Sequence, residues 1–345
     1  MTKRADEIRS YVLKNVSEHP AGIVNITASQ FHITRQSAAR HVRQLVNNGI
    51  LTANGKTKAR KYELKKLVDE IFHLDVTQGF EEDVIWRQNV LPLMTNLPKN
   101  VLDICQYGFT EILNNVLVHS EATKAWVSIK RDAVLVTIQI YDYGVGIFNK
   151  IQRAFNLHDP RHALLELTKG KLTSEQAHHT GEGIFFASRM FDELSILSSN
   201  LFFDRVNKQD DDWLIEAEER NQSEGTLVTM EIHTQARQTT SEIFTRATSG
   251  ELSHDFSRTH VPVKLARYDT EQLVSRSQAR RVLARFDQFK EVLLDFQGIA
   301  EIGPAFADEI FRVYQNEHPE IHILAIHALP QVQQMIDRTK QAIEV

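Results

Sequence analysis

Residues 111–119 read EILNNVLVH and place Glu111 and Asn115 four positions apart. Apolar residues recur around them at helical spacing, so we predict one long helix over 101–119. Residues four apart in a helix lie on one face, one turn from each other. This helix therefore presents a carboxylate and an amide side by side.

Two glycine-containing motifs follow the helix. A predicted strand over 134–141 runs directly into DYGVG at 142–146, and TGEGI at 180–184 precedes a predicted helix over 185–192. Further strands are predicted over 125–130, 195–199, 213–218 and 225–233. This mixture of elements predicts an α/β layer structure.

The motifs E-x-x-x-N, D-x-G-x-G and G-x-G, in this order, resemble the Bergerat-type (GHKL) ATP-binding family of gyrase, heat-shock chaperones, histidine kinases and mismatch-repair ATPases. The helix at 111–119 is most similar to that of the anti-sigma-factor serine kinases. The resemblance covers roughly residues 85–235. It implies an α/β sandwich over 101–240, with a lid at 147–180, that binds ATP and Mg²⁺.

The resemblance also implies roles for individual residues. The Asp142 carboxylate accepts a hydrogen bond from the adenine amino group, and Thr226 hydrogen-bonds near the adenine through water. The Asn115 amide oxygen binds Mg²⁺, which prefers oxygen ligands. The remaining contacts are close backbone approaches and a helix N-terminus that holds phosphates. These are made by Gly144, Gly146, Gly181, Glu182, Gly183 and Ile184.

Glu111 is the candidate catalytic residue, because a carboxylate here can orient or deprotonate a water or a substrate hydroxyl. Histidine kinases usually carry asparagine at this position, so Glu111 favours an ATPase or a serine/threonine kinase. His119 fits a helix cap or a phosphate contact equally well. Three lysines of the lid, namely Lys150, Lys169 and Lys171, fit either a phosphate contact or a solvated surface.

Residues 1–66 carry a net charge of +9, whereas the rest of the chain carries −14. Three predicted helices and a hairpin around Asn54-Gly55 resemble a winged helix-turn-helix, with Thr27 and Thr34 as N-caps of the second and third helices. The resemblance implies binding of double-stranded DNA; a winged helix used for protein contacts is the alternative. The DNA-binding candidates are Arg35, Gln36, Ser37, Arg40, Arg43, Lys56, Lys58 and Arg60.

Two segments remain. Residues 67–100 are predicted to be a mostly helical connector. Residues 255–345 alternate strands and helices, with a helix capped by Asp269 or Thr270, and resemble the STAS-like domains related to anti-sigma-factor antagonists. Antagonists usually present a phosphorylatable hydroxyl at the turn that reads Gly-Pro-Ala here, at 303–305. We therefore expect a protein partner for this domain but no phosphorylation at that turn.

The chain is thus predicted to be a multidomain α/β (α+β) protein: winged helix, Bergerat-type sandwich, STAS-like domain. It has one cysteine and no long apolar run or secretory signal, so we expect a cytoplasmic protein without membrane contact. A homodimer is compatible with the sequence. The first hypothesis is an ATP-responsive, DNA-binding regulator, with slow hydrolysis allowed. The alternatives are a serine/threonine kinase acting on a separate partner and an adaptor that binds ATP without turnover.

Overall fold

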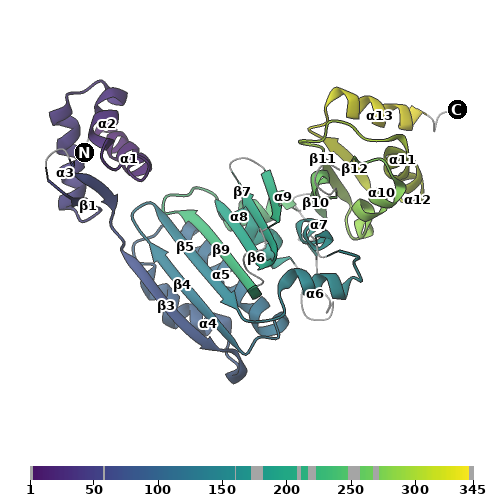
Figure 1. Ribbon diagram of the computed structural model, residues 1–345, viewed down its shortest axis with the longest axis horizontal. Helices are drawn as coiled ribbons and strands as arrows, with labels where there is room; N and C mark the ends of the chain where they lie inside the picture. Colours follow the sequence, from purple (N-terminus) through teal and green to yellow (C-terminus); the bar gives the residue numbers. More distant parts are fainter. Residues whose placement is uncertain are drawn as a thin grey trace.

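A computed structural model describes residues 3–56, 59–159, 161–171, 182–207, 211–216, 223–247, 257–266 and 272–341. Figure 1 shows three parts along the long axis of the molecule. A helical N-terminal unit lies at one end, a large sheet with helices lies in the middle, and a small sheet with helices lies at the C-terminal end.

The N-terminal unit has three helices and a hairpin, as the sequence predicts. Its elements are α1 (Lys3–Asn15), α2 (Ile23–Phe31), α3 (Arg35–Asn47), β1 (Leu51–Asn54) and β2 (Lys61–Leu64). The side chain of Thr34 accepts a hydrogen bond from the Ser37 N–H at 3.2 Å, which confirms it as the N-cap of α3. Thr27 is no N-cap, because α2 already begins at Ile23 and buries Thr27.

The prediction of a helical connector over 67–100 is wrong for its first part. Residues 68–75 form strand β3 (Val68–Asp75), which pairs antiparallel with the strand over 124–131. Val68, Phe72 and Leu74 turn toward the helix-covered side and pack on the core, at the even spacing of a half-buried strand. The helical elements come afterwards: η2 (Val76–Gln78), α4 (Glu82–Ile85), the π-helical η3 (Trp86–Val90) and η4 (Leu91–Leu93).

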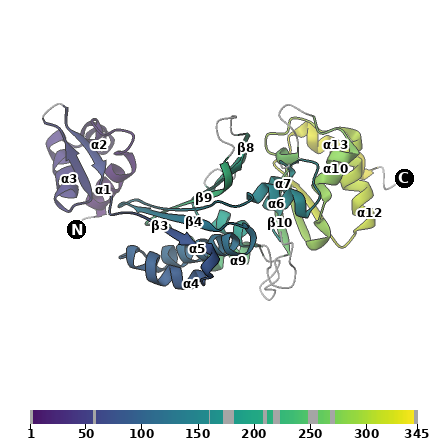
Figure 2. The same cartoon turned by 60° about the horizontal axis from the view of Figure 1, so that its bottom comes forward.

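The central sheet has seven antiparallel strands in the order β3-β4-β5-β9-β6-β7-β8. The strands after β3 are β4 (Lys124–Arg131), β5 (Leu135–Asp142), β6 (Glu193–Ser199), β7 (Leu201–Val206), β8 (Asp211–Glu216) and β9 (Ser223–His233). Strand β7 is absent from the sequence prediction. Helices α5 (Lys99–His119), α8 (Gly183–Met190) and α9 (Thr240–Ala247) pack on one another. Figure 2 shows α5 and α9 on one face of the sheet.

Two short helices lie in the predicted lid, α6 (Ile147–Ala154) and α7 (His162–Lys169). In Figure 1 they lie between the central sheet and the C-terminal unit. Every residue of α7 is buried.

The C-terminal unit is a three-stranded parallel sheet in the order β10-β11-β12, covered by helices. Its elements are β10 (Arg258–Pro262), η5 (Val263–Ala266), α10 (Arg276–Leu283), η6 (Phe286–Gln288), β11 (Glu291–Asp295), α11 (Pro304–Asp308), η7 (Glu309–Tyr314), α12 (Gln315–Glu317), β12 (His322–Ile326) and α13 (Pro330–Gln341). Helix α10 begins at Arg276 with a Ser275–Gln278 capping box, which corrects the cap predicted at 269 or 270.

The described residues form two buried apolar clusters, fewer than the number of domains that the sequence predicts. The N-terminal unit has its own apolar core. The buried apolar side chains of the central sheet and of the C-terminal unit form one continuous cluster. No helix in the described part of the chain is long and apolar enough to cross a membrane.

Candidate functional site

Most of the residues that the sequence predicts for ATP binding line one cavity between α5, β5, α6 and α8. Its volume is about 310 Å³, and we call it the central cavity. Eight of the predicted residues line it: Glu111, Asn115, Asp142, Gly146, Glu182, Gly183, Ile184 and Thr226. They come from four separate stretches of the sequence, so their convergence depends on the tertiary fold.

Helix α5 supplies the first pair. The apolar side of α5 is buried, with Ile112, Leu113 and Val116 in the core. Glu111 and Asn115 lie one turn apart and both reach the central cavity. Burial raises the pKa of Glu111 above its usual value, and the negative charge of Glu82 adds to this effect. A carboxyl with a raised pKa accepts a proton more readily, as a general base requires.

Asp142 ends β5 and faces Thr226 on the neighbouring strand β9. The residue is 5% exposed, and its Oδ1 accepts a hydrogen bond from the Gly144 N–H at 2.8 Å. Burial raises the pKa of Asp142 to about 6, although hydrogen bonds from Gly144 and Thr226 oppose the shift. The cavity thus contains a buried carboxylate, the acceptor that an exocyclic amino group on a planar base would need.

The turn after Asp142 is packed tightly against the end of α5. The Val145 N–H donates to the Ser120 carbonyl at 2.9 Å, and a Cβ on Gly144 would collide with that same carbonyl. The Ile147 N–H donates to the Thr226 hydroxyl at 3.0 Å, which fixes the start of α6. Gly144 does not line the cavity itself; it allows the turn to close beneath it.

Helix α8 begins at Gly183, directly beside Glu111. A Cβ on Gly183 would collide with the Glu111 carboxylate, so the start of α8 lies directly against the Glu111 side chain. The N-terminus of an eight-residue helix offers free N–H groups to anions. Gly181, the other predicted glycine of this motif, lies outside the described residues.

Among the three lysines of the predicted lid, Lys150 lines the central cavity. Its Nζ donates to the His119 carbonyl at 2.6 Å and lies 3.4 Å from a Glu121 carboxylate oxygen. His119 also lines the cavity. Lys169 and Lys171 instead contact carbonyls of the C-terminal unit, and Lys169 is fully buried. A solvated role is therefore excluded for Lys169, whereas Lys171 is half-buried.

Sequence reasoning missed the apolar part of the lining. Ile147, Ile151 and Phe155 from the α6 region and Leu167 from α7 line the central cavity, as does the polar Asn114 of α5. The apolar spacing over 147–154 is the sequence signal that could have predicted a cavity-facing helix. Nothing local marks Leu167, because its place depends on how α7 packs.

The predicted DNA-binding residues lie apart from the cavity, in the N-terminal unit. Arg35, Gln36, Arg40 and Arg43 are exposed on α3, and Ser37 is half-buried at its first turn. Within the described part of the chain, none of these three arginines forms an ion pair with a carboxylate. In the hairpin, Lys56 and Arg60 are exposed, whereas Lys58 lies outside the described residues. The exposed cations thus follow one helix and the adjoining hairpin.

The raised pKa of Asp142 predicts a pH dependence for binding of an adenine ring. Above pH 6 the group is an ionised acceptor; below it the group is increasingly protonated. If the protonated form does not bind, affinity at pH 5.5 falls about fourfold below that at pH 7.5. Adenosine is the suitable ligand, because it lacks phosphates that titrate in this range, and NMR titration measures its affinity. A flat profile would show that the Asp142 carboxylate is not the acceptor.

Comparison with known families bears on the C-terminal unit. Residues 278–333, from α10 to the first residues of α13, match a family described as a STAS-like domain of unknown function (DUF4325). No curated protein matches the chain. The chain therefore is a mixed α/β protein that carries a STAS-like domain in its C-terminal part.

Proposed function

We propose that the chain is a DNA-binding regulator whose central cavity binds Mg-ATP. The observation that carries this proposal is the convergence of Glu111, Asn115, Asp142 and Gly183 on one cavity of about 310 Å³. The four residue types match the needs of one ligand: a carboxylate for the base, an amide for a metal, a helix N-terminus for phosphates and a second carboxylate beside them.

Two sets of polar groups in the cavity suit different parts of ATP. Asp142 and Thr226 form a polar pair on the neighbouring strands β5 and β9, where the adenine would bind. Gly183 begins α8 beside Glu111, where the phosphates would lie against free backbone N–H groups. Apolar side chains such as Ile140 and Val228 also line the cavity and would contact a flat aromatic ring.

Mg²⁺ fits this cavity as a partner of the nucleotide. Among the described residues, no group of three His, Cys, Asp or Glu side chains could hold a metal ion. Asn115 offers an amide oxygen, and Mg²⁺ characteristically completes its coordination with phosphate oxygens and water. When bound, the ion would neutralise phosphate charge, while Glu111 would accept the proton of the attacking water or hydroxyl.

The N-terminal unit supports the DNA part of the proposal. Thr34 caps α3, and the exposed Arg35 and Gln36 lie at its N-terminal end with the half-buried Ser37, where a recognition helix contacts base edges. Arg40 and Arg43 follow on the exposed side, suited to phosphate contacts. Nucleotide binding would change how α6 and α7 pack. That change would alter how the N-terminal and C-terminal units bind their partners.

A serine/threonine kinase acting on a separate protein remains the second candidate, because the half-buried Glu111 lies beside the start of α8 with a raised pKa. The same residue could activate water or a hydroxyl. Incubation with γ-labelled ATP and candidate partners separates the two: label on protein identifies a kinase, and label only in inorganic phosphate identifies an ATPase.

Glu111→Gln tests the chemical role of this carboxylate. Glutamine keeps the size and an acceptor oxygen but takes up no proton, so we expect turnover of ATP to fall at least about 100-fold. Affinity for Mg-ATP should stay within about threefold, since the nucleotide contacts remain. Phosphate release and calorimetry measure the two quantities. Glu70→Gln, on exposed β3, is the matched control. Equal turnover in Glu111→Gln and the wild type would remove the assignment.

A further inference from the structure

Helices α7 and α10 cap each other's carboxyl ends. Lys169, the last residue of α7, donates from Nζ to the carbonyls of Arg281 (3.2 Å) and Ala284 (2.8 Å) at the end of α10. Arg285, just after α10, donates from Nη2 to the carbonyls of Gly170 (2.8 Å) and Lys171 at the end of α7. Carbonyls at a helix end lack partners within the helix, so each side chain satisfies groups of the other helix.

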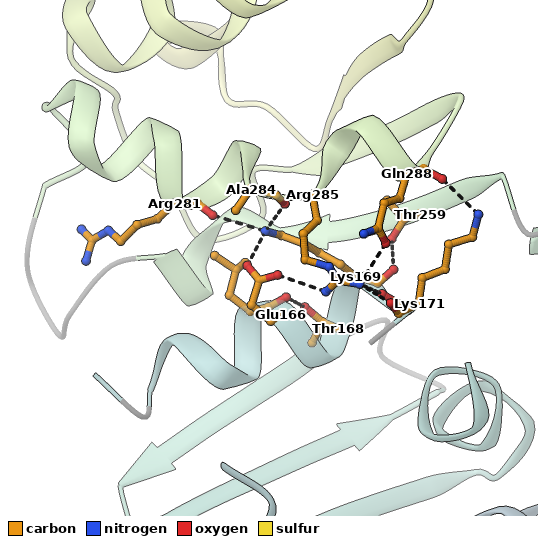
Figure 3. Close-up of polar contacts among 11 residues, drawn as sticks. Glu166, Thr168, Lys169, Lys171, Thr259, Arg281, Ala284, Arg285 and Gln288 are labelled. Atoms are coloured by element: carbon orange, nitrogen blue, oxygen red, sulfur yellow. Dashed lines mark hydrogen bonds and ion pairs between the residues drawn. The ribbon is translucent and has the colours of Figure 1, made fainter. Parts of the chain in front are cut away.

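One buried carboxylate joins the two cations, as Figure 3 shows. Glu166 accepts from Lys169 at 2.7 Å through Oε1 and from Arg285 at 3.1 Å through Oε2. The Lys169 side chain has no exposed surface, and that of Glu166 has 4%. Removing one partner of such a buried network leaves a charge without compensation, which costs far more than losing a surface pair.

Further bonds extend the junction to the parallel sheet. The Thr259 hydroxyl on β10 donates to the Lys169 carbonyl at 2.7 Å, and Lys171 Nζ donates to the Gln288 carbonyl at 3.0 Å. The Lys169 ammonium also lies 5.5 Å from the centre of the Phe286 ring. Helix α7 is thus bound to the C-terminal unit by hydrogen bonds along its whole carboxyl end.

The same short helix also forms part of the central cavity. Leu167 lies two residues before Lys169 and lines the cavity together with Phe155. Leu167 is 5% exposed, so it is packed on the cavity side as firmly as Lys169 is on the other. The buried apolar cluster is continuous through both units, so close packing connects these two contacts.

We infer that the C-terminal unit holds α7 in place as one wall of the nucleotide cavity, with Lys169 and Arg285 as positioning residues for Leu167. This inference rests on the proposed ATP site. A nucleotide that contacts Leu167 must then stabilise the junction between α7 and α10. By thermodynamic linkage, a partner that binds the C-terminal unit and shifts this junction changes nucleotide affinity by the factor by which the nucleotide changes the partner's affinity. The C-terminal domain is therefore the sensor of nucleotide occupancy.

Hydrogen exchange on the full wild-type chain tests the inference directly. The amides of Ala284, Gln288 and Phe289 are hydrogen-bonded at the end of α10 and report on the junction. With a non-hydrolysable ATP analogue and Mg²⁺, we expect slower exchange in α5 and β5 and also over 281–289. Protection of α5 and β5 alone would overturn the inference and leave the ATP site standing. No protection anywhere would sink the proposed ATP site itself.

A variant gives the second test. Lys169→Met keeps most of the unbranched side chain but removes the ammonium and its three donors, so we expect affinity for the analogue to fall about tenfold and protection over 281–289 to vanish. Arg280→Met is the control, because Arg280 lies on α10 but pairs with Glu309 within the C-terminal unit rather than with α7. Both variants are compared at a temperature where circular dichroism shows them folded. Equal loss of affinity in the two variants, or none in Lys169→Met, would contradict the inference.

Discussion

Asp142→Ala is expected to weaken binding of Mg-ATP by roughly 10- to 150-fold. A hydrogen bond to a charged group contributes about 1.5–3 kcal/mol, and the substitution removes the only charged acceptor proposed for the adenine amino group. It also leaves the Gly144 N–H, which donates to this carboxylate at 2.8 Å, without its partner. Calorimetric titration of the full chain measures the loss.

The control for this variant is Asp103→Ala, which removes an exposed carboxylate of α5 that pairs with Lys99. It should bind ATP as the wild type does. Selectivity provides a further check, since loss of the Asp142 acceptor should narrow the preference for ATP over GTP. An Asp142→Ala variant that stays folded and keeps full affinity would place the base elsewhere.

The double variant Arg40→Ala/Arg43→Ala is expected to weaken binding of duplex DNA by roughly 10- to 100-fold at fixed salt. Both arginines are exposed on α3. If each contacts a phosphate, their removal lowers the slope of log affinity against log salt by about 2. Fluorescence anisotropy with labelled duplexes of mixed sequence, at several salt concentrations, measures affinity and slope together.

A matched variant separates this effect from a general loss of charge. Lys99→Ala/Lys124→Ala removes the same charge from exposed positions of the central unit, on α5 and β4. It should change DNA affinity little. If both double variants lose affinity equally, the attraction is unspecific; if neither does, the N-terminal unit serves protein contacts instead.

The site could be predicted from sequence wherever its signal is local. Glu111 and Asn115 share a helix, and the 142–146 and 180–184 motifs are each five consecutive residues, so spacing alone indicates which residues lie together. The Thr34 cap of α3 is similarly local and is confirmed. That the described members of these motifs meet in one cavity is the contribution of the fold.

The failures of prediction share a physical cause. In the described sheet, β3 lies at the edge and pairs with β4, which begins 56 residues after the start of β3. The exposed Ile71 also breaks the alternation of apolar and polar residues that is typical of a strand. The carbonyl acceptors of Lys169 and the arginine partner of Glu166 lie more than a hundred residues along the chain. A short stretch of sequence around 166–169 does not contain those partners. The buried role of Lys169 could therefore not be distinguished from that of a solvated lysine.

The most direct test of the account is a calorimetric titration of the full chain with a non-hydrolysable ATP analogue, with and without Mg²⁺. The account predicts one site per chain, tighter binding with Mg²⁺, and a marked loss of affinity in Asp142→Ala. The central cavity would then be the nucleotide site. Absence of binding at millimolar analogue, or equal binding by the Asp142→Ala variant, would contradict it.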